Sequence, residues 1–175
     1  MSNAENKQYT PAAIANNILW LAQQDGIRIS PMKLLKLVYF VYGWSLVILK
    51  RKIFEEKIQA WQYGPVIPSL YYEFQRFGKS YIEGFASQAL LNPETGDIHK
   101  VVHPMIEQED TDLFSVISEI WKLYKDKSAM TLSDITHEHD SAWCKAIKIG
   151  LRADLDDDDI KQRSLEGINK HYASQ

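Results

Sequence analysis

An apolar run between Pro31 and a basic triplet at residues 50–52 constrains the fold of this chain more than any other stretch. Its hydrophobic side chains fall on nearly every face of a helix, and such a helix has no side to present to solvent. The elements before and after it must therefore cover it. Ser30 followed by Pro31 is typical of a helix start, and the basic triplet is typical of a helix end. We predict a buried central helix over about residues 31–49.

The remaining segments predict shorter elements around that helix. Strand-like pieces within residues 53–61 indicate a short strand pair or an irregular cover, and turn signals at 92–97 predict a small β-hairpin. Helical spacing of apolar residues and capping residues predict helices over about 10–25, 68–78, 113–124, 141–149 and 160–172, with a short one capped by Thr131 and Asp134. The predicted fold class is mainly α, a compact helical domain with a minor β-hairpin or irregular edge.

The composition is that of an ordinary globular chain. It has 175 residues, 45% of them hydrophobic and 25% charged, which is enough for a single well-filled core. We predict one domain over residues 1–150, followed by an acidic-led tail helix over 151–175. The longest uncharged apolar run, residues 37–49, is too short to span a bilayer, so we expect no membrane partner.

Net charge and cysteine content limit the possible binding partners and the cellular compartment. The net charge of −3 gives no overall basic field that would draw the protein onto nucleic acid. Cys144 is the only cysteine, which excludes an internal disulfide and fits a reducing compartment. The polar residues 1–9 contain no apolar signal region. We expect a cytoplasmic protein.

The most unusual local string is WQYGPVIP, which begins at Trp61. Two prolines and a glycine within five residues cannot continue a helix or a central strand, so we predict a rigid, shaped turn. An aromatic turn of this kind between two helices is either a hydrophobic plug or a recognition surface. The residue types alone leave both interpretations open.

Three stretches in this order resemble the SocA-like family, also called the Panacea antitoxin domain, which includes many phage-associated proteins. They are SPMKLLKLVYF from Ser30 with GWSL from Gly43, AWQYGPVIP from Ala60, and LSDITHE from Leu132 followed by Trp143. Together they span roughly residues 9–149. One departure is Ala142, where the family pattern leads us to expect proline before the tryptophan.

The resemblance implies a function in toxin neutralisation. Its expected partner is a cognate toxin encoded by a neighbouring gene, bound directly or handed to a protease. The rigid turn supplies a plausible surface, because a pre-organised turn loses little entropy on binding. The candidate partner-binding residues comprise the turn and three aromatic residues expected behind it: Tyr63, Gly64, Pro65 and Val66, with Trp61, His137 and Trp143.

A DNA-binding regulator of phage or mobile-element origin is the alternative function. It would use a helix-turn-helix and a cluster of basic residues that follows phosphates, namely Lys33, Lys36, Lys50, Arg51, Lys52 and Lys57. The acidic balance and the neighbouring tryptophans argue against it. We therefore expect no specific nucleic-acid partner.

Catalysis and cofactors find little support in the sequence. There is no glycine-rich phosphate loop and no serine elbow, and Cys144 on a predicted helix is typical of packing. The cluster of His137, Glu138, His139 and Asp140 does not converge on one ion if it is helical, because residues two apart point in different directions. We expect no catalytic, cofactor-binding or metal-binding residues, and a non-enzymatic protein.

Overall fold

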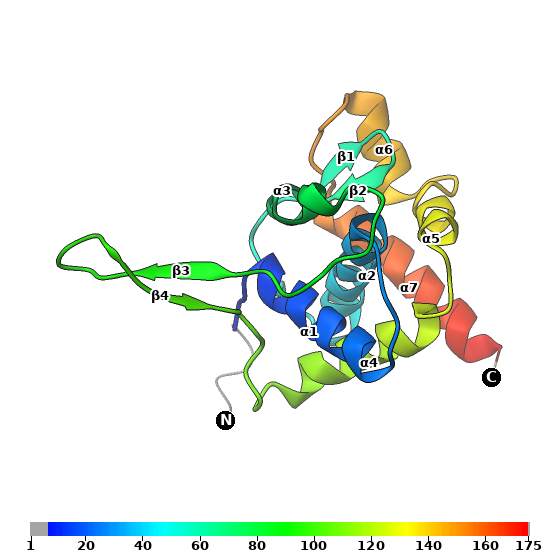
Figure 1. Ribbon diagram of the computed structural model, residues 1–175. Helices are drawn as coiled ribbons and strands as arrows, with labels where there is room; N and C mark the ends of the chain where they lie inside the picture. The colour runs from blue at the N-terminus through cyan, green and yellow to red at the C-terminus, as the bar shows by residue number, and fades with distance from the viewer. Residues whose placement is uncertain (1–6, 175) are drawn as a thin grey trace.

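In the computed structural model, residues 7–174 are described. Over this range the chain forms seven α-helices and two separate two-stranded sheets. The helix α2 (Pro31–Ile48) lies at the centre, with α1 (Pro11–Gln24), α4 (Thr111–Tyr124) and α7 (Asp157–Ala173) packed against it (Figure 1). The structure confirms the predicted mainly α fold with a minor β component.

The central helix is buried as its sequence predicts. The Ser30 hydroxyl caps it by accepting a hydrogen bond from the Lys33 backbone N–H. Length and apolar content alone would let α2 cross a membrane, but 83% of its residues are buried inside the fold. Its large apolar residues Leu37, Phe40 and Trp44 are all buried. We therefore identify α2 as the core helix.

The helix α7 covers one face of α2. The two helices cross so closely at Gly43 that a Cβ there would overlap the Ser164 hydroxyl. Asp156 caps α7, which begins three residues earlier than predicted because the acidic run forms its first turn. The division between residues 1–150 and 151–175 stays a prediction, although α7 packs directly on the core helix.

The shorter helices mostly follow their predicted limits. The helix α3 (Pro68–Phe74) continues as a single 3₁₀ turn, η2 (Gln75–Phe77). Ser141 caps α6 (Ala142–Ile149), so Ala142 occupies the first helical position, where proline is also well tolerated.

The cap of α5 (Ala129–Thr136) was wrongly predicted. Ser128, not Thr131, is the cap residue, and the backbone N–H of Thr131 donates to its hydroxyl. Ser128 is as good a cap as Thr131, and Ala129 and Met130 are good helix formers, so the helix starts three residues sooner.

We predicted a turn over the whole string from Trp61 to Pro68, but most of this string belongs to a β-hairpin. The strands β1 (Gln59–Trp61) and β2 (Gly64–Val66) pair antiparallel, and only Gln62 and Tyr63 connect them. Pro65 is tolerated within β2 because β2 pairs with β1 alone, so no strand on its other edge needs a backbone N–H from this residue.

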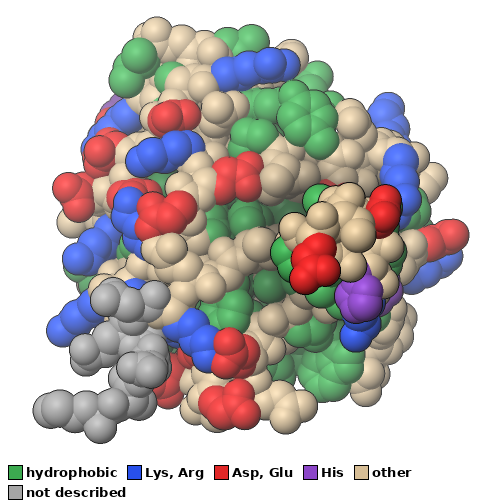
Figure 2. All heavy atoms as spheres, turned by 90° about the vertical axis from the view of Figure 1, so that its left-hand side faces the viewer, with side chains coloured by type: hydrophobic (Ala, Val, Ile, Leu, Met, Phe, Trp, Pro, Cys, Tyr) green, Lys and Arg blue, Asp and Glu red, His purple; other side chains and the backbone are tan. Residues whose placement is uncertain are grey.

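A second hairpin projects from the helical body as an arm (Figure 1). It pairs β3 (Gln88–Leu91) with β4 (Ile98–Val102), as predicted, and Asn92 organises its turn by accepting from the Glu94 N–H. Acidic side chains gather at the end of this arm, and hydrophobic side chains surround it on the body (Figure 2). Asn16 of α1 holds the base of the arm through bonds to Ala86 and Pro104.

Candidate interaction site

The three sequence stretches that carry the family resemblance meet around the β1–β2 hairpin. From α2, the Lys36 ammonium donates to the carbonyl oxygen of Pro65 at 3.1 Å. From α5, the Ser133 hydroxyl donates to the carbonyl oxygen of Tyr63 at 3.1 Å. From α6, the indole N–H of Trp143 donates to the carbonyl oxygen of Trp61 at 2.8 Å. The backbone of this hairpin is therefore held by three separate helices.

Gly64 permits the closest of these approaches. Its φ of +107° lies in the region that L side chains rarely adopt. A Cβ at this position would lie 2.5 Å from the Lys36 Nζ and 2.9 Å from the Thr136 Oγ1. Both the backbone conformation and the space around it therefore require glycine here.

His137 and Trp143 support the hairpin from behind. The His137 Nδ1 lies 2.7 Å from the carbonyl oxygen of Ser133, so this nitrogen carries the proton and donates it. The imidazole ring meets the Trp143 ring edge-on, with centroids 3.9 Å apart. Burial lowers the pKa of His137, and the nearby Lys36 charge lowers it further, while the bond to Ser133 opposes the shift. The ring is thus kept neutral as a packing and orienting group.

Lys36 is the most unusual residue of the site. Its side chain is only 2% exposed, and it forms no ion pair with any described residue. Burial lowers the pKa of Lys36 to about 7. Its one polar contact is the Pro65 carbonyl oxygen, which leaves two of the three ammonium N–H groups without a protein acceptor among residues 7–174.

The outer side of the hairpin carries an exposed aromatic tip and a groove. Tyr63 is 68% exposed, whereas Gly64, Pro65 and Val66 are buried. Beside the tip lies a groove of about 400 Å³ between the start of α2, the hairpin and α3. Its lining is mostly apolar and aromatic and contains no acidic residue: Pro31, Met32, Leu35, Lys36, Trp61, Gln62, Tyr63, Val66, Tyr71, Gln75 and Gly78.

Comparison with known proteins identifies the family. Residues 34–144 match the sequence model of the family described as "Antitoxin SocA-like, Panacea domain". This chain belongs to that family. The matched residues include Lys36, the whole β1–β2 hairpin, His137 and Trp143, so the site lies inside the Panacea domain.

One curated relative supports the same assignment. The chain is 30% identical over 131 residues to the protein "Antitoxin SocA" of Caulobacter vibrioides (strain NA1000 / CB15N). This match covers 75% of the present chain and 66% of the relative, just under two thirds of its length. No solved structure matches the chain.

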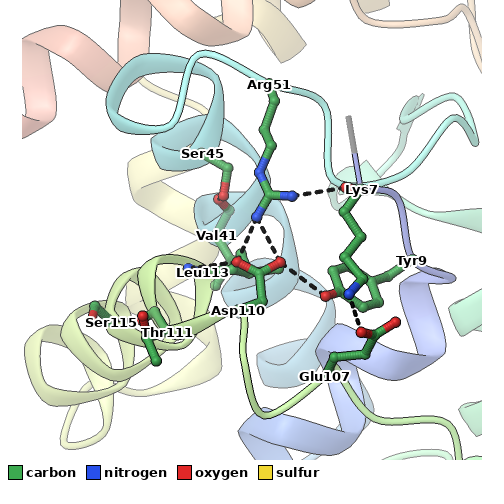
Figure 3. Close-up of polar contacts among 10 residues, drawn as sticks. All are labelled: Lys7, Tyr9, Val41, Ser45, Arg51, Glu107, Asp110, Thr111, Leu113 and Ser115. Carbon is green, nitrogen blue, oxygen red and sulfur yellow. Dashed lines mark hydrogen bonds and ion pairs between the residues drawn. The ribbon is translucent and has the colours of Figure 1, made fainter. Parts of the chain in front are cut away.

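The basic cluster expected for a DNA-binding protein is not a surface in this Panacea domain. Lys33 and Lys36 are buried, and the Lys33 ammonium donates to the carbonyl oxygen of Lys125. Arg51 makes a buried ion pair with Asp110, both of whose carboxylate oxygens lie 2.7 Å from its Nη2 (Figure 3). Lys52 pairs with Asp157 at 2.6 Å. Four of the six residues of this alternative cluster are therefore turned inward or paired with acids, and only Lys50 and Lys57 are exposed.

The acidic and histidine residues that follow α5 also have separate partners. His137 bonds the backbone, Glu138 pairs with Arg163, and His139 pairs with its neighbour Asp140. Over the described part of the chain, no three His, Cys, Asp or Glu side chains lie close enough to hold a metal ion. Cys144 is half-buried on α6.

Sequence reasoning missed the role of Lys36 at this site and counted it among exposed phosphate contacts. A signal was available, because Lys33 and Lys36 both lie inside a run that must be buried on every face. A charged residue in such a run is buried with the helix unless its long stem reaches the surface. The close approach of Lys36 to Gly64 joins residues far apart in the chain and has no local signature.

Proposed function

We propose that this Panacea-domain protein is an antitoxin that neutralises a cognate toxin by binding it, without catalysis, in the cytoplasm. The surface proposed for binding is the tip of the β1–β2 hairpin with its adjoining groove. The observation that carries this proposal is the exposure of Tyr63 at the end of a hairpin whose backbone is fixed by Lys36, Ser133 and Trp143.

Rigidity is the physical reason for choosing this surface. A protein interface gains affinity when its contact residues are already ordered, because less conformational entropy is lost on binding. Tyrosine is also among the residues enriched at interface hot spots, since its ring buries a large area with few rotatable bonds. An exposed tyrosine on a held turn combines both properties.

Two modes of neutralisation fit this proposal. The antitoxin either blocks the toxin within a stable complex or delivers it to a protease. The half-life of the toxin in cells with and without the antitoxin distinguishes them, because blocking leaves the half-life unchanged or longer and delivery shortens it.

Co-expression with the product of the neighbouring gene tests the proposal. We expect the wild-type protein to restore growth and to co-purify with the toxin, and Tyr63→Ala to weaken the complex about thirtyfold or more, as at a hot spot. Its melting temperature should stay unchanged, because Tyr63 packs little of its side chain. Tyr172→Ala is the matched control, since Tyr172 is 53% exposed on α7. If no neighbouring product is toxic, the antitoxin proposal fails.

A further inference from the structure

A buried lysine without a counter-ion is the feature that the proposed function leaves unexplained. Replacing such a charge by an apolar side chain of similar volume is commonly neutral or stabilising, because desolvation of an ammonium group is costly. Lys36 is 2% exposed and its only described polar partner is a neutral carbonyl. Its environment therefore favours an additional, negatively charged partner.

The groove beside the hairpin has the electrostatic character that suits such a partner. Lys36 is the only charged residue in its lining, and no Asp or Glu lines it. Pro31 and Met32, the first two residues of α2, also line the groove. The N-terminal end of an 18-residue helix carries a partial positive charge, so helix and lysine both favour an anion over a cation in this groove.

The walls of the groove define what should surround that anion. Trp61, Tyr63, Tyr71, Leu35 and Val66 are aromatic or aliphatic. A free inorganic anion would not use these walls, whereas an acidic side chain between apolar neighbours would fill them and reach the positive charge.

We infer that the groove receives an aspartate or glutamate side chain of the toxin, flanked by apolar residues, and that Lys36 is its counter-charge. This inference rests on the proposed function. It makes Lys36 a residue that costs stability in the free antitoxin and contributes affinity in the complex. A lysine that serves only to hold the hairpin would contribute in the free protein instead.

The test compares two buried lysines on the same helix. Lys36→Met should weaken binding of the purified neighbouring gene product about tenfold to a hundredfold, the range for a charge-assisted hydrogen bond, while leaving the melting temperature equal or higher. Lys33→Met is the matched control: Lys33 is also buried on α2 and bonds a carbonyl oxygen, but it does not line the groove. It should leave affinity unchanged.

A double-mutant cycle identifies the partner carboxylate. Each Asp and Glu of the toxin is changed to Asn or Gln and titrated against wild-type antitoxin and Lys36→Met. One acidic position should weaken binding to the wild type and have no further effect on the variant. Should Lys36→Met fail to fold, Lys36→Gln retains a neutral donor to Pro65 and takes its place.

A small probe tests the groove without the toxin. We expect 3-phenylpropionate to shift the indole N–H resonance of Trp61 and to bind about tenfold more tightly than the uncharged 3-phenylpropanamide. Lys36→Met should remove this preference and Lys33→Met should keep it. Equal binding of acid and amide to the wild-type protein would overturn the inference.

The outcomes separate the inference from the proposed function. If Tyr63→Ala abolishes toxin binding and Lys36→Met does not, the interface is right and the acidic contact is wrong. If Lys36→Met lowers the melting temperature as much as it lowers affinity, Lys36 only holds the hairpin and the inference is overturned. If no toxin binds and the probe still prefers the acid through Lys36, the groove chemistry stands while the antitoxin proposal falls.

Discussion

The β1–β2 hairpin has three residues in each strand and is mostly buried, whereas the β3–β4 arm has longer strands that are exposed at nearly every position. Three helices bond the backbone of the first hairpin, while side-chain bonds from Asn16 reach the second only at its base. An isolated two-stranded hairpin is at best marginally stable in water. The shorter ladder should therefore be the more stable one, because packing and attachment outweigh strand length.

The arm also carries an apolar face without cover. Paired residues of antiparallel strands share a face, so Ala89 lies beside Val101 and Leu91 beside Ile98. Leu91 is two residues from Ala89 and so lies on the same side of β3. All four side chains are exposed, and no described residue of the body covers them.

The largest expected effect comes from the attachment where the arm returns to the body. Asp110 caps α4 and accepts hydrogen bonds from Arg51 and Tyr9 (Figure 3). Asp110→Asn should lower the free energy of unfolding by about 3–5 kcal/mol, because it leaves the Arg51 charge buried without its carboxylate. Asp112→Asn, at an exposed position in the same first turn, is the control and should cost under about 0.5 kcal/mol in urea unfolding.

The same carboxylate predicts a pH dependence. Burial opposes ionisation of Asp110, but hydrogen bonds from Arg51 and Tyr9 outweigh it and hold the pKa below its ordinary value. The stabilisation is therefore complete above the unfolded-state pKa and is lost as pH falls through the lower folded-state pKa. Acid unfolding of the wild type should be steeper in this range than that of Asp110→Asn. Parallel curves for the two proteins would contradict this role.

A glycine-to-alanine pair tests the two hairpins directly. Gly64→Ala should cost about 2–4 kcal/mol, because alanine is strained at this φ and its Cβ would crowd Lys36 and Thr136. Gly96→Ala in the turn of the arm also meets a positive φ of +74°, but no atom lies within 4 Å of the new Cβ. It should cost about 1 kcal/mol by thermal unfolding. If both substitutions lowered the free energy of unfolding equally, tighter packing around the β1–β2 hairpin would not be the difference between the two hairpins.

Two adjacent buried asparagines test the base of the arm. Asn16→Ala should cost about 2 kcal/mol and speed amide exchange in β3 and β4, because it removes three hydrogen bonds to Ala86 and Pro104. Asn17→Ala removes only a bond to the Ala13 carbonyl within α1. It should leave exchange in the arm unchanged, even if it lowers global stability. If amide exchange in the arm became faster in both variants, Asn16 would not be a specific anchor of the arm.

Shortening the arm should have the smallest effect. If residues 92–97 are replaced by the two-residue turn Asn-Gly, we expect the melting temperature to change little, with a free-energy change within about 0.5 kcal/mol. All of the removed residues except Asn92 are exposed, and the hydrogen bonds of this turn join only residues 92–97 to one another. A large loss of stability would show that the exposed arm supports the helical core after all.

The sequence predicted those features whose signal lies in contiguous residues. The all-round apolar run predicted α2 and its burial, and the capping residues Thr10 and Ser30, each followed by proline, predicted two helix starts. The turn residues from Asn92 predicted the arm. Such signals depend on local backbone conformation, so they do not depend on contacts with distant parts of the chain.

Features that depend on distant contacts were not predicted. Gly64-Pro65-Val66 was assigned to the turn, yet it is a strand because Gln59-Ala60-Trp61 pairs with it. Exposure of Tyr63 and burial of Lys36 follow from the approach of α5 and α2 to the hairpin. The anchoring role of Asn16 depends on residues about seventy and ninety positions away.

The close crossing at Gly43 also affects the order in which the domain can be completed during synthesis. Residues leave the ribosome in sequence, so α2 is made well before α7, its cover on the Gly43 face. In that interval Trp44 and its apolar neighbours lack part of their final surroundings, and contacts between distant segments form slowly. The supply of folded protein in a cell is then set by the rate of this closure as well as by the rate of translation.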